Sequence, residues 1–155
     1  LYVGLMIKNE KPYLIEFNVR MGDPECQTIL PLLENDLSEI FFDCCVGKLS
    51  EKKIKLSKKK SICIVLCSKG YPEDYKKDSE ISKLNKLSLK DNEYIYHAGT
   101  KLKDNKILNS GGRVLNFVST SNNLKESRDD LIKLIKRLDW ENGFFRKDIA
   151  YKVID

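Results

Sequence analysis

The sequence has no apolar run close to the roughly 20 residues that a membrane-spanning helix needs. Its start also lacks a charged segment followed by an apolar stretch and a cleavage site, the features of a secretory signal. The composition, 41% hydrophobic and 33% charged over 155 residues, excludes a disordered or fibrous chain and allows one domain with a sizeable core. We therefore expect a cytoplasmic, globular protein with no membrane partner.

Residues that bind zinc are few and poorly spaced. The chain has one histidine, His97, and five cysteines without a Cys-x-x-Cys pair, namely Cys26, Cys44, Cys45, Cys63 and Cys67. Structural zinc sites use four nitrogen or sulfur ligands in paired spacings, so the sequence predicts no such site. We interpret the cysteines as small apolar residues in a reducing compartment, including Cys63 and Cys67 on one strand face. His97 is more typical of a structural hydrogen bond than of catalysis.

Lysines gather in one segment of a chain whose net charge is +5, at Lys52, Lys53, Lys55, Lys58, Lys59 and Lys60. Such a patch can contact nucleic-acid phosphates. Single-strand binders usually add aromatic stacking platforms, and no aromatic residue is interleaved with these lysines. We interpret the run as a solvated linker and predict no nucleic-acid partner. A non-catalytic basic binding module is the alternative.

Polar and apolar residues alternate from Pro12 to Arg20, which predicts a strand. Successive strand side chains point to opposite faces, so Glu16, Asn18 and Arg20 share one face. A carboxylate and an amide carbonyl two residues apart can both offer oxygen to a hard cation such as Mg²⁺, and a guanidinium can hold a phosphate. The run fits a metal-nucleotide site, although periodicity alone favours a solvated strand face.

A tight turn, Gly22-Asp23-Pro24-Glu25, follows this strand. Its residue types predict Asp23 as the N-cap and Pro24 as the first residue of a helix. A helix N-terminus aimed at the strand end would offer backbone donors and a positive dipole end to an anion. Simple capping, which needs no ligand, is the alternative.

Apolar periodicity and turn residues divide the rest of the chain into strands and helices. The helix from Pro24 is interrupted near Pro31, and a second runs over 36–46 with Asn35 as a possible cap and Gly47 as its stop. Strands are expected over 1–7, 13–19, 61–67, 93–97 and 113–119, and a helix with one buried apolar stripe over 123–138.

Two features of the second half suggest turns and ion pairs. The pair Gly111-Gly112 predicts a turn that needs permissive backbone angles. Arg113 could reach a ligand or a carboxylate partner, and a structural use is favoured. Arg146 could tether the tail to the first part of the chain.

Sequence motifs in a fixed order run along nearly the whole chain. Residues 1–6, 16–27 and 29–33 closely resemble the last part of the ATP-grasp domain of the phosphoribosylamine–glycine ligases. The downstream motifs resemble the C-terminal domain of the same family in the same order, at 68–72, 97–100, 110–115 and 146–150. That family usually has Phe at the position of Met21, which is also apolar. Glu-Phe-Asn alone would indicate only ATP-grasp enzymes in general.

The resemblance implies an α+β protein: the end of an ATP-grasp domain followed by a small, mainly β domain of the rudimentary hybrid-motif type with a packed helix. It implies the C-terminal part of the ATP-grasp domain over 1–47, a basic linker over 48–60 and a C-terminal β-rich domain over 61–155. In this family the amine-substrate domain and the nucleotide-clamping lobe lie upstream. We therefore expect a C-terminal fragment that is inactive alone.

By resemblance, the complete enzyme joins glycine to 5-phosphoribosylamine with ATP, through a glycyl phosphate, giving glycinamide ribonucleotide, ADP and phosphate in purine biosynthesis. Glu16 and Asn18 match the family's metal positions and would bind Mg²⁺ or Mn²⁺. Arg20 would neutralise the transferred phosphate, and Asp23 with the Gly22 backbone would shape the glycine pocket. This assigns catalytic roles to Arg20 and Asp23 and ligand-binding roles to Arg20 and Gly22.

The resemblance also implies which partners the chain has. They are ATP, glycine, 5-phosphoribosylamine and the upstream domains of the same chain, in a monomer. Another ATP-grasp carboxylate–amine ligase is the alternative that the strand motif alone permits.

Overall fold

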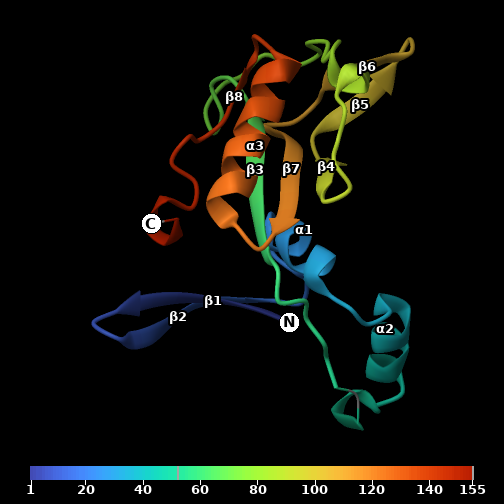
Figure 1. The fold of residues 1–155 in the computed structure, drawn as a ribbon, viewed down its shortest axis with the longest axis vertical. Helices are drawn as coiled ribbons and strands as arrows, with labels where there is room; N and C mark the ends of the chain where they lie inside the picture. The colour runs from blue at the N-terminus through green and yellow to red at the C-terminus, as the bar shows by residue number, and fades with distance from the viewer. Residues whose placement is uncertain (52, 155) are drawn as a thin grey trace.

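The computed structural model describes residues 1–51 and 53–154. In chain order the strands and helices are β1 (Tyr2–Lys8), β2 (Lys11–Asn18), α1 (Glu25–Ile29), α2 (Leu37–Cys45), β3 (Lys60–Ser68), β4 (Glu93–His97), β5 (Thr100–Lys103), β6 (Lys106–Asn109), β7 (Arg113–Ser121), α3 (Leu124–Leu138) and β8 (Gly143–Phe144). Figure 1 shows a sheet with α3 against it, and the β1–β2 hairpin and α2 extending from one end. Lys52 of the lysine run and Asp155 lie outside the described residues.

The first two predicted strands form an antiparallel pair that is joined by a two-residue turn. Asn9 and Glu10 form the turn and have φ values of 51° and 61°. Two-residue hairpin turns need a left-handed backbone at both central positions, which asparagine tolerates well. The strands therefore extend closer to the turn than the sequence predicted, and Pro12 lies inside β2.

A β-bulge interrupts the predicted alternation along β2. Glu16 lies opposite Gly4 on β1. The next pair joins Leu14 to Leu5, so Ile15 is the extra residue. Asn18 follows Glu16 on the far side of the bulge, so these two polar side chains keep their common face.

The segment after β2 corrects one capping prediction. α1 begins at Glu25 with Pro24 at its N-cap position, and no side chain caps it. Asp23 is not the N-cap, because its carboxylate accepts a hydrogen bond from the side chain of Gln27 at 2.9 Å instead. The chain then tightens into a 3-10 turn that contains Pro31, which confirms the predicted interruption.

The second helix, α2, is capped by a neighbour of the predicted residue. Asp36 accepts from the backbone N–H of Ser38 at 2.8 Å. Asn35 is instead engaged across the chain, where its side chain accepts from the N–H of Lys55 at 2.6 Å. The helix stops before Gly47, which has a φ of 74°, as the sequence predicted.

The core lies between α3 and a four-stranded antiparallel sheet of order β4-β7-β3-β8. The predicted strands over 61–67, 93–97 and 113–119 and the helix over 123–138 are confirmed. The buried apolar stripe of α3 consists of Leu131, Leu134, Ile135 and Leu138. It packs against alternate residues of two strands, namely Ile62, Ile64 and Leu66 of β3 and Leu115 and Phe117 of β7. Asn123 caps α3 by accepting from the N–H of Glu126.

Three strands were not predicted from the sequence. β5 and β6 form a small hairpin whose turn, Asp104 and Asn105, has φ values of 50° and 59°. β5 has lysines at alternate positions, Lys101 and Lys103, and each of the two strands has only four residues, so neither shows a clear apolar pattern. β8 has only two residues, opposite Cys67 and Ser68 at the edge of the sheet.

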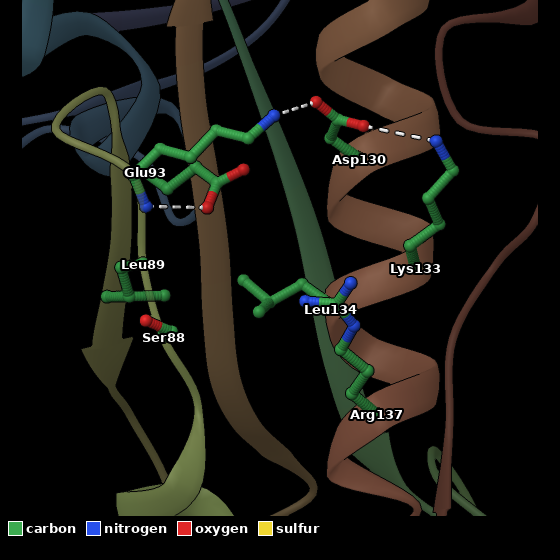
Figure 2. Close-up of a pocket in the computed structure, with 8 residues that line it drawn as sticks. Ser88, Leu89, Glu93, Asp130, Lys133, Leu134 and Arg137 are labelled. Carbon is green, nitrogen blue, oxygen red and sulfur yellow. Dashed lines mark hydrogen bonds and ion pairs between the residues drawn. The ribbon is translucent and has the colours of Figure 1, made fainter.

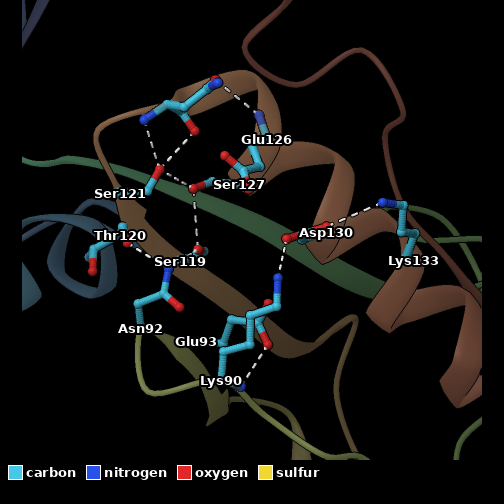
Figure 3. Close-up of polar contacts among 11 residues, drawn as sticks. Lys90, Asn92, Glu93, Ser119, Thr120, Ser121, Glu126, Ser127, Asp130 and Lys133 are labelled. Carbon is cyan, nitrogen blue, oxygen red and sulfur yellow. Dashed lines mark hydrogen bonds and ion pairs between the residues drawn. The ribbon is translucent and has the colours of Figure 1, made fainter.

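Charged residues join the segment before β4 to α3 around a polar cavity of about 380 Å³. The Lys90 side chain donates to Asp130, and Lys133 approaches the other oxygen of that carboxylate at 3.3 Å (Figures 2 and 3). The hydrogen bond from Lys90 holds the pKa of Asp130 below its usual value. Glu93 accepts from the backbone N–H of Lys90 at 3.0 Å. The cavity is therefore a junction between two elements whose carboxylates already have partners.

Candidate functional site

One cavity of about 210 Å³ lies where the β1–β2 hairpin meets the turn before α1 and the start of β7. It is lined by Tyr2, Glu16, Asn18, Arg20, Gly22, Asp23, Glu25 and Arg113. The fold thus places around one cavity all five residues that the sequence suggested for metal, nucleotide and substrate binding. Tyr2 and Glu25 were not singled out from the sequence.

The oxygen-bearing side chains of β2 are held by its pairing with β1. Glu16 and Asn18 are two positions apart on one face, opposite Gly4 and Tyr2. Gly4 leaves room for the carboxylate arm, because a Cβ there would lie 3.0 Å from Glu16 Cγ. Within residues 1–51 and 53–154, neither polar side chain has a hydrogen bond or ion pair. Their oxygens are available to a hard cation.

Arg20 supplies positive charge beyond the end of β2. Its Nη1 donates to the carbonyl oxygen of Met21 at 3.1 Å, and the side chain is exposed. No carboxylate forms an ion pair with it among the residues that the structure describes. Its remaining N–H groups can therefore donate hydrogen bonds to an anion such as phosphate.

Gly22 brings the backbone close to a carboxylate. A Cβ at this position would lie 2.1 Å from Glu25 Oε2, so a side chain there would displace that group. The Gly22 carbonyl oxygen accepts from the N–H of Cys26 at 2.9 Å. Because α1 has five residues, its dipole contributes little to the cavity.

Asp23 joins the first part of the chain to the sheet. Its carboxylate Oδ1 accepts from Gln27, and Oδ2 lies 3.4 Å from Arg113 Nε. Arg113 Nη1 also donates to the backbone oxygen of Asp23 at 3.2 Å. The sequence left open whether Arg113 contacts a ligand or a carboxylate. The structure gives it a carboxylate partner within the same cavity.

The other polar residues considered from the sequence lie outside this cavity. His97 Nδ1 is 2.8 Å from Thr100 Oγ1, a structural contact of the kind that was favoured. Arg146 pairs with Asp148, two residues away, at 2.7 Å, and among residues 1–51 and 53–154 no ion pair joins it to the first part of the chain.

The glycine pair before Arg113 corrects another prediction. Neither Gly111 nor Gly112 has a positive φ. Gly112 is required for close packing, because a Cβ there would lie 2.0 Å from the ring of Tyr71. A Cβ on Gly111 would lie 3.0 Å from Gly99 Cα. Space, not backbone angle, explains these glycines.

The comparison with known proteins identifies the family to which this fold belongs. The family model described as "Phosphoribosylglycinamide synthetase, C domain" matches residues 61–152. The chain belongs to this synthetase family. The match includes β3, β7 and α3, and therefore Arg113, but not the β1–β2 hairpin.

Relatives of the synthetase family match the remaining residues as well. The phosphoribosylamine–glycine ligase of Caldanaerobacter subterraneus subsp. tengcongensis is 45% identical over 150 residues, 97% of this chain and 35% of that protein. The ligase of the same name from Haemophilus influenzae is 40% identical over 156 residues, 100% of this chain and 36% of that protein. The chain thus spans about a third of the length of these relatives.

Part of a solved structure of the synthetase family has a fold like that of this chain. It is the crystal structure of phosphoribosylamine–glycine ligase from Thermotoga maritima, with a TM-score of 0.71 and 31% identity over 96% of this chain and 36% of that one. The arrangement of helices and strands in this chain therefore matches one that is already known from a solved structure. A small, mainly β part with one packed helix is common to both.

Metal and membrane features complete the description of this synthetase-family chain. Among residues 1–51 and 53–154, no cluster of three or more His, Cys, Asp or Glu side chains is arranged to hold a metal ion. A helix in this part of the chain that is long and apolar enough to cross a membrane was not found either.

An apolar cleft of about 400 Å³ lies beside the candidate site. Pro24, Tyr71 and Phe145 contribute to its walls, together with Cys63 and Cys67 of β3. Both thiols lie on the predicted common face. Burial raises the pKa of Cys63 from 9.0 to about 12. Burial also raises the pKa of Cys67, while the nearby Arg113 lowers it in part.

The cysteines are expected to react at very different rates. At pH 8, a pKa of about 12 instead of 9.0 leaves Cys63 about a thousandfold less thiolate. Cys44 is exposed, so a reagent can reach its thiol from solvent. A chromogenic aromatic disulfide should label Cys44 roughly a hundredfold faster than Cys63 or more. Peptide mass spectrometry measures the labelling of each cysteine. Equal rates in the native chain would contradict the buried position of Cys63; denatured chain is the control.

Proposed function

We propose that this chain is the C-terminal portion of an ATP-dependent ligase that joins glycine to 5-phosphoribosylamine. The observation that carries the proposal is the single cavity that gathers Glu16, Asn18 and Arg20, two oxygen-bearing side chains and an exposed guanidinium with no carboxylate partner among the described residues. The names of the relatives support the choice of substrates.

The donor set around the cavity fits a divalent cation that is shared with a nucleotide. Magnesium is usually bound by one or two carboxylates together with substrate phosphates, not by an all-protein cage. One carboxylate, Glu16, and one amide, Asn18, are the donors that this part of the protein would contribute to Mg²⁺ or Mn²⁺ with ATP. When bound, the cation would neutralise charge on the phosphates.

The reaction divides into two displacements. A carboxylate oxygen of glycine attacks the γ-phosphorus of ATP, and ADP leaves. The amine nitrogen of phosphoribosylamine then attacks the acyl carbon and loses a proton, and phosphate leaves with that oxygen. Arg20 would hold the negative oxygens of the transferring group, a contribution that fixed positive charge makes to such transition states. Asp23 and the Gly22 backbone would border the glycine.

The proposal assigns residues 1–47 to the end of an ATP-grasp domain, 48–60 to a basic linker and 61–155 to the C-terminal domain. Large apolar side chains on the hairpin support a further domain of the same protein as its neighbour. Ile7 is 61% exposed, Ile15 62% and Phe17 61%. Large apolar side chains that are exposed together on one element indicate a surface that another protein segment covers. We expect the complete protein to be a cytoplasmic monomer.

An isotope experiment with the complete protein tests the proposed reaction. Glycine labelled with ¹⁸O in its carboxylate is supplied with ATP, Mg²⁺ and freshly formed phosphoribosylamine. We expect ADP formation that depends on glycine, and one ¹⁸O atom in each phosphate released, because that oxygen passes from carboxylate to phosphate. Turnover with a different amino acid or amine, and none with this pair, would replace the proposal with another ATP-grasp ligase.

A further inference from the structure

Arg113 reaches the cavity because of a bulge at the start of β7. Leu66 of β3 lies opposite Leu115, but the next pair joins Cys67 to Arg113, so Val114 is the extra residue. In a regular strand, residues two positions apart share a face, so Arg113 would lie on the face of Leu115, which packs against α3. The bulge turns the guanidinium towards the hairpin instead. Bulges that redirect a side chain in this way are frequent beside active sites.

The backbone that carries Arg113 is held firmly. Its carbonyl oxygen accepts from the N–H of Gly99 at 2.8 Å. The two preceding carbonyls are also bound: Gly112 O accepts from the Ser68 N–H at 2.7 Å, and Gly111 O from Ser68 Oγ at 2.8 Å. A long side chain on a rigid segment can present its donors in a defined position.

Asp23 orients the guanidinium of Arg113 but leaves part of it without a hydrogen-bond partner. Nη1 and Nε face Asp23, at 3.2 Å from its backbone oxygen and 3.4 Å from its carboxylate. Nη2 donates to no group among the residues described, and the side chain is 44% exposed. Arg20 lines the same cavity and also has unused donors. Two arginines from distant parts of the sequence therefore face one small space.

An ion pair with no ligand role accounts for these contacts less well. Exposed ion pairs contribute little to stability. A simple tie between the hairpin segment and the sheet would not need a bulge that turns Arg113 into a cavity already lined by Glu16 and Asn18. The guanidinium of Arg113 lies in one cavity with the unpaired oxygens of Glu16 and Asn18 and with a second arginine, a position that suits contact with an anion.

We propose that Arg113 is a substrate-binding residue, and that Asp23 positions its guanidinium to bind an oxyanion of a substrate. The proposal rests on the proposed function for the identity of that substrate. The oxyanion is a carboxylate or a phosphate, which arginine recognises through the same paired donors. In the ligase these are the carboxylate of glycine or the phosphate of phosphoribosylamine. Asp23 thereby acts through Arg113.

The test uses the complete protein with Arg113→Met, Arg113→Lys and Asp23→Asn. Arg146→Met is the matched control, because Arg146 is also an exposed arginine paired with an aspartate. Calorimetric titration measures the Kd of glycine and of ribose 5-phosphate, and steady-state kinetics measures KM and kcat. Thermal unfolding of every variant is recorded as well.

We expect Arg113→Met to raise the Kd and KM of one anionic substrate about 10- to 100-fold, with little change in the unfolding temperature. Arg113→Lys should lie between it and the unchanged protein, because lysine keeps the charge but not the fork of donors. Asp23→Asn should raise the same constant by a smaller factor. An effect limited to glycine identifies a carboxylate contact, and one limited to ribose 5-phosphate a phosphate contact.

Two outcomes would overturn the proposal: constants within twofold of the unchanged protein for both ligands, or an equal rise in Arg146→Met. The proposed function fails separately. If the unchanged protein binds these anions through Arg113 but shows no glycine-dependent turnover, the contact stands and the ligase assignment is wrong.

Discussion

Replacing Glu16 with glutamine in the complete protein is expected to lower kcat/KM for ATP about a hundredfold or more at millimolar Mg²⁺. The substitution keeps the shape of the side chain but removes the negative charge that a divalent cation would neutralise. Glu16 is exposed and has no partner among the described residues, so its replacement should leave the unfolding temperature nearly unchanged. Initial rates across a Mg²⁺ titration, beside thermal unfolding, separate the two effects.

The hairpin offers a matched control for this experiment. Glu10→Gln makes the same chemical change at the exposed turn, far along the strand pair from Glu16. It should leave the rate unaffected. Asn18→Ala should reduce the rate by a smaller factor, because a neutral amide oxygen contributes less to a cation than a carboxylate does. Full activity of Glu16→Gln at every Mg²⁺ concentration would exclude the proposed metal position.

Replacing Gly99 with alanine is expected to destabilise the sheet end that carries Arg113 by about 3 kcal/mol. A Cβ at Gly99 would lie 2.6 Å from the carbonyl oxygen of Arg113 and 2.6 Å from Gly111 Cα. Both are backbone atoms, so relief requires the segment itself to move. The displaced guanidinium should also weaken anion binding, and thermal unfolding with ligand titration measures both effects.

Gly47→Ala provides the contrast in the same chain. Gly47 has a φ of 74° but nothing within 4 Å of an added Cβ. Only backbone strain should appear there, about 1 kcal/mol. If the two alanine variants unfolded at the same temperature, the close contact between Gly99 and Gly111 would be wrong.

Local sequence signals were enough to predict the main elements of this fold. The apolar spacing of α3 and the β-rich run of β3 predicted the core, because the apolar residues that recur with a helical or strand period are the ones that are buried. The polar face at Glu16 and Asn18 was equally readable, since two residues on one strand share a side whatever the strand packs against.

Features that depend on contacts between distant residues could not be predicted. Asp23 looked like a helix cap, but its carboxylate turns to Gln27 and Arg113, and the latter is 90 positions away. The direction of Arg113 depends on a bulge that no residue type announces. Gly111-Gly112 was expected to need unusual backbone angles, whereas the structure requires only space there. Tertiary packing decided each of these cases.

Direct binding of Mn²⁺-ATP is the measurement that most closely tests the proposed site. Free Mn²⁺ is followed by electron paramagnetic resonance during titration of the complete protein, unchanged and with Glu16→Gln and Asn18→Ala combined. We predict that the double variant binds the metal-nucleotide at least about a hundredfold more weakly while unfolding at nearly the same temperature. Equal affinity in the two proteins would contradict the assignment of this cavity to the metal and nucleotide.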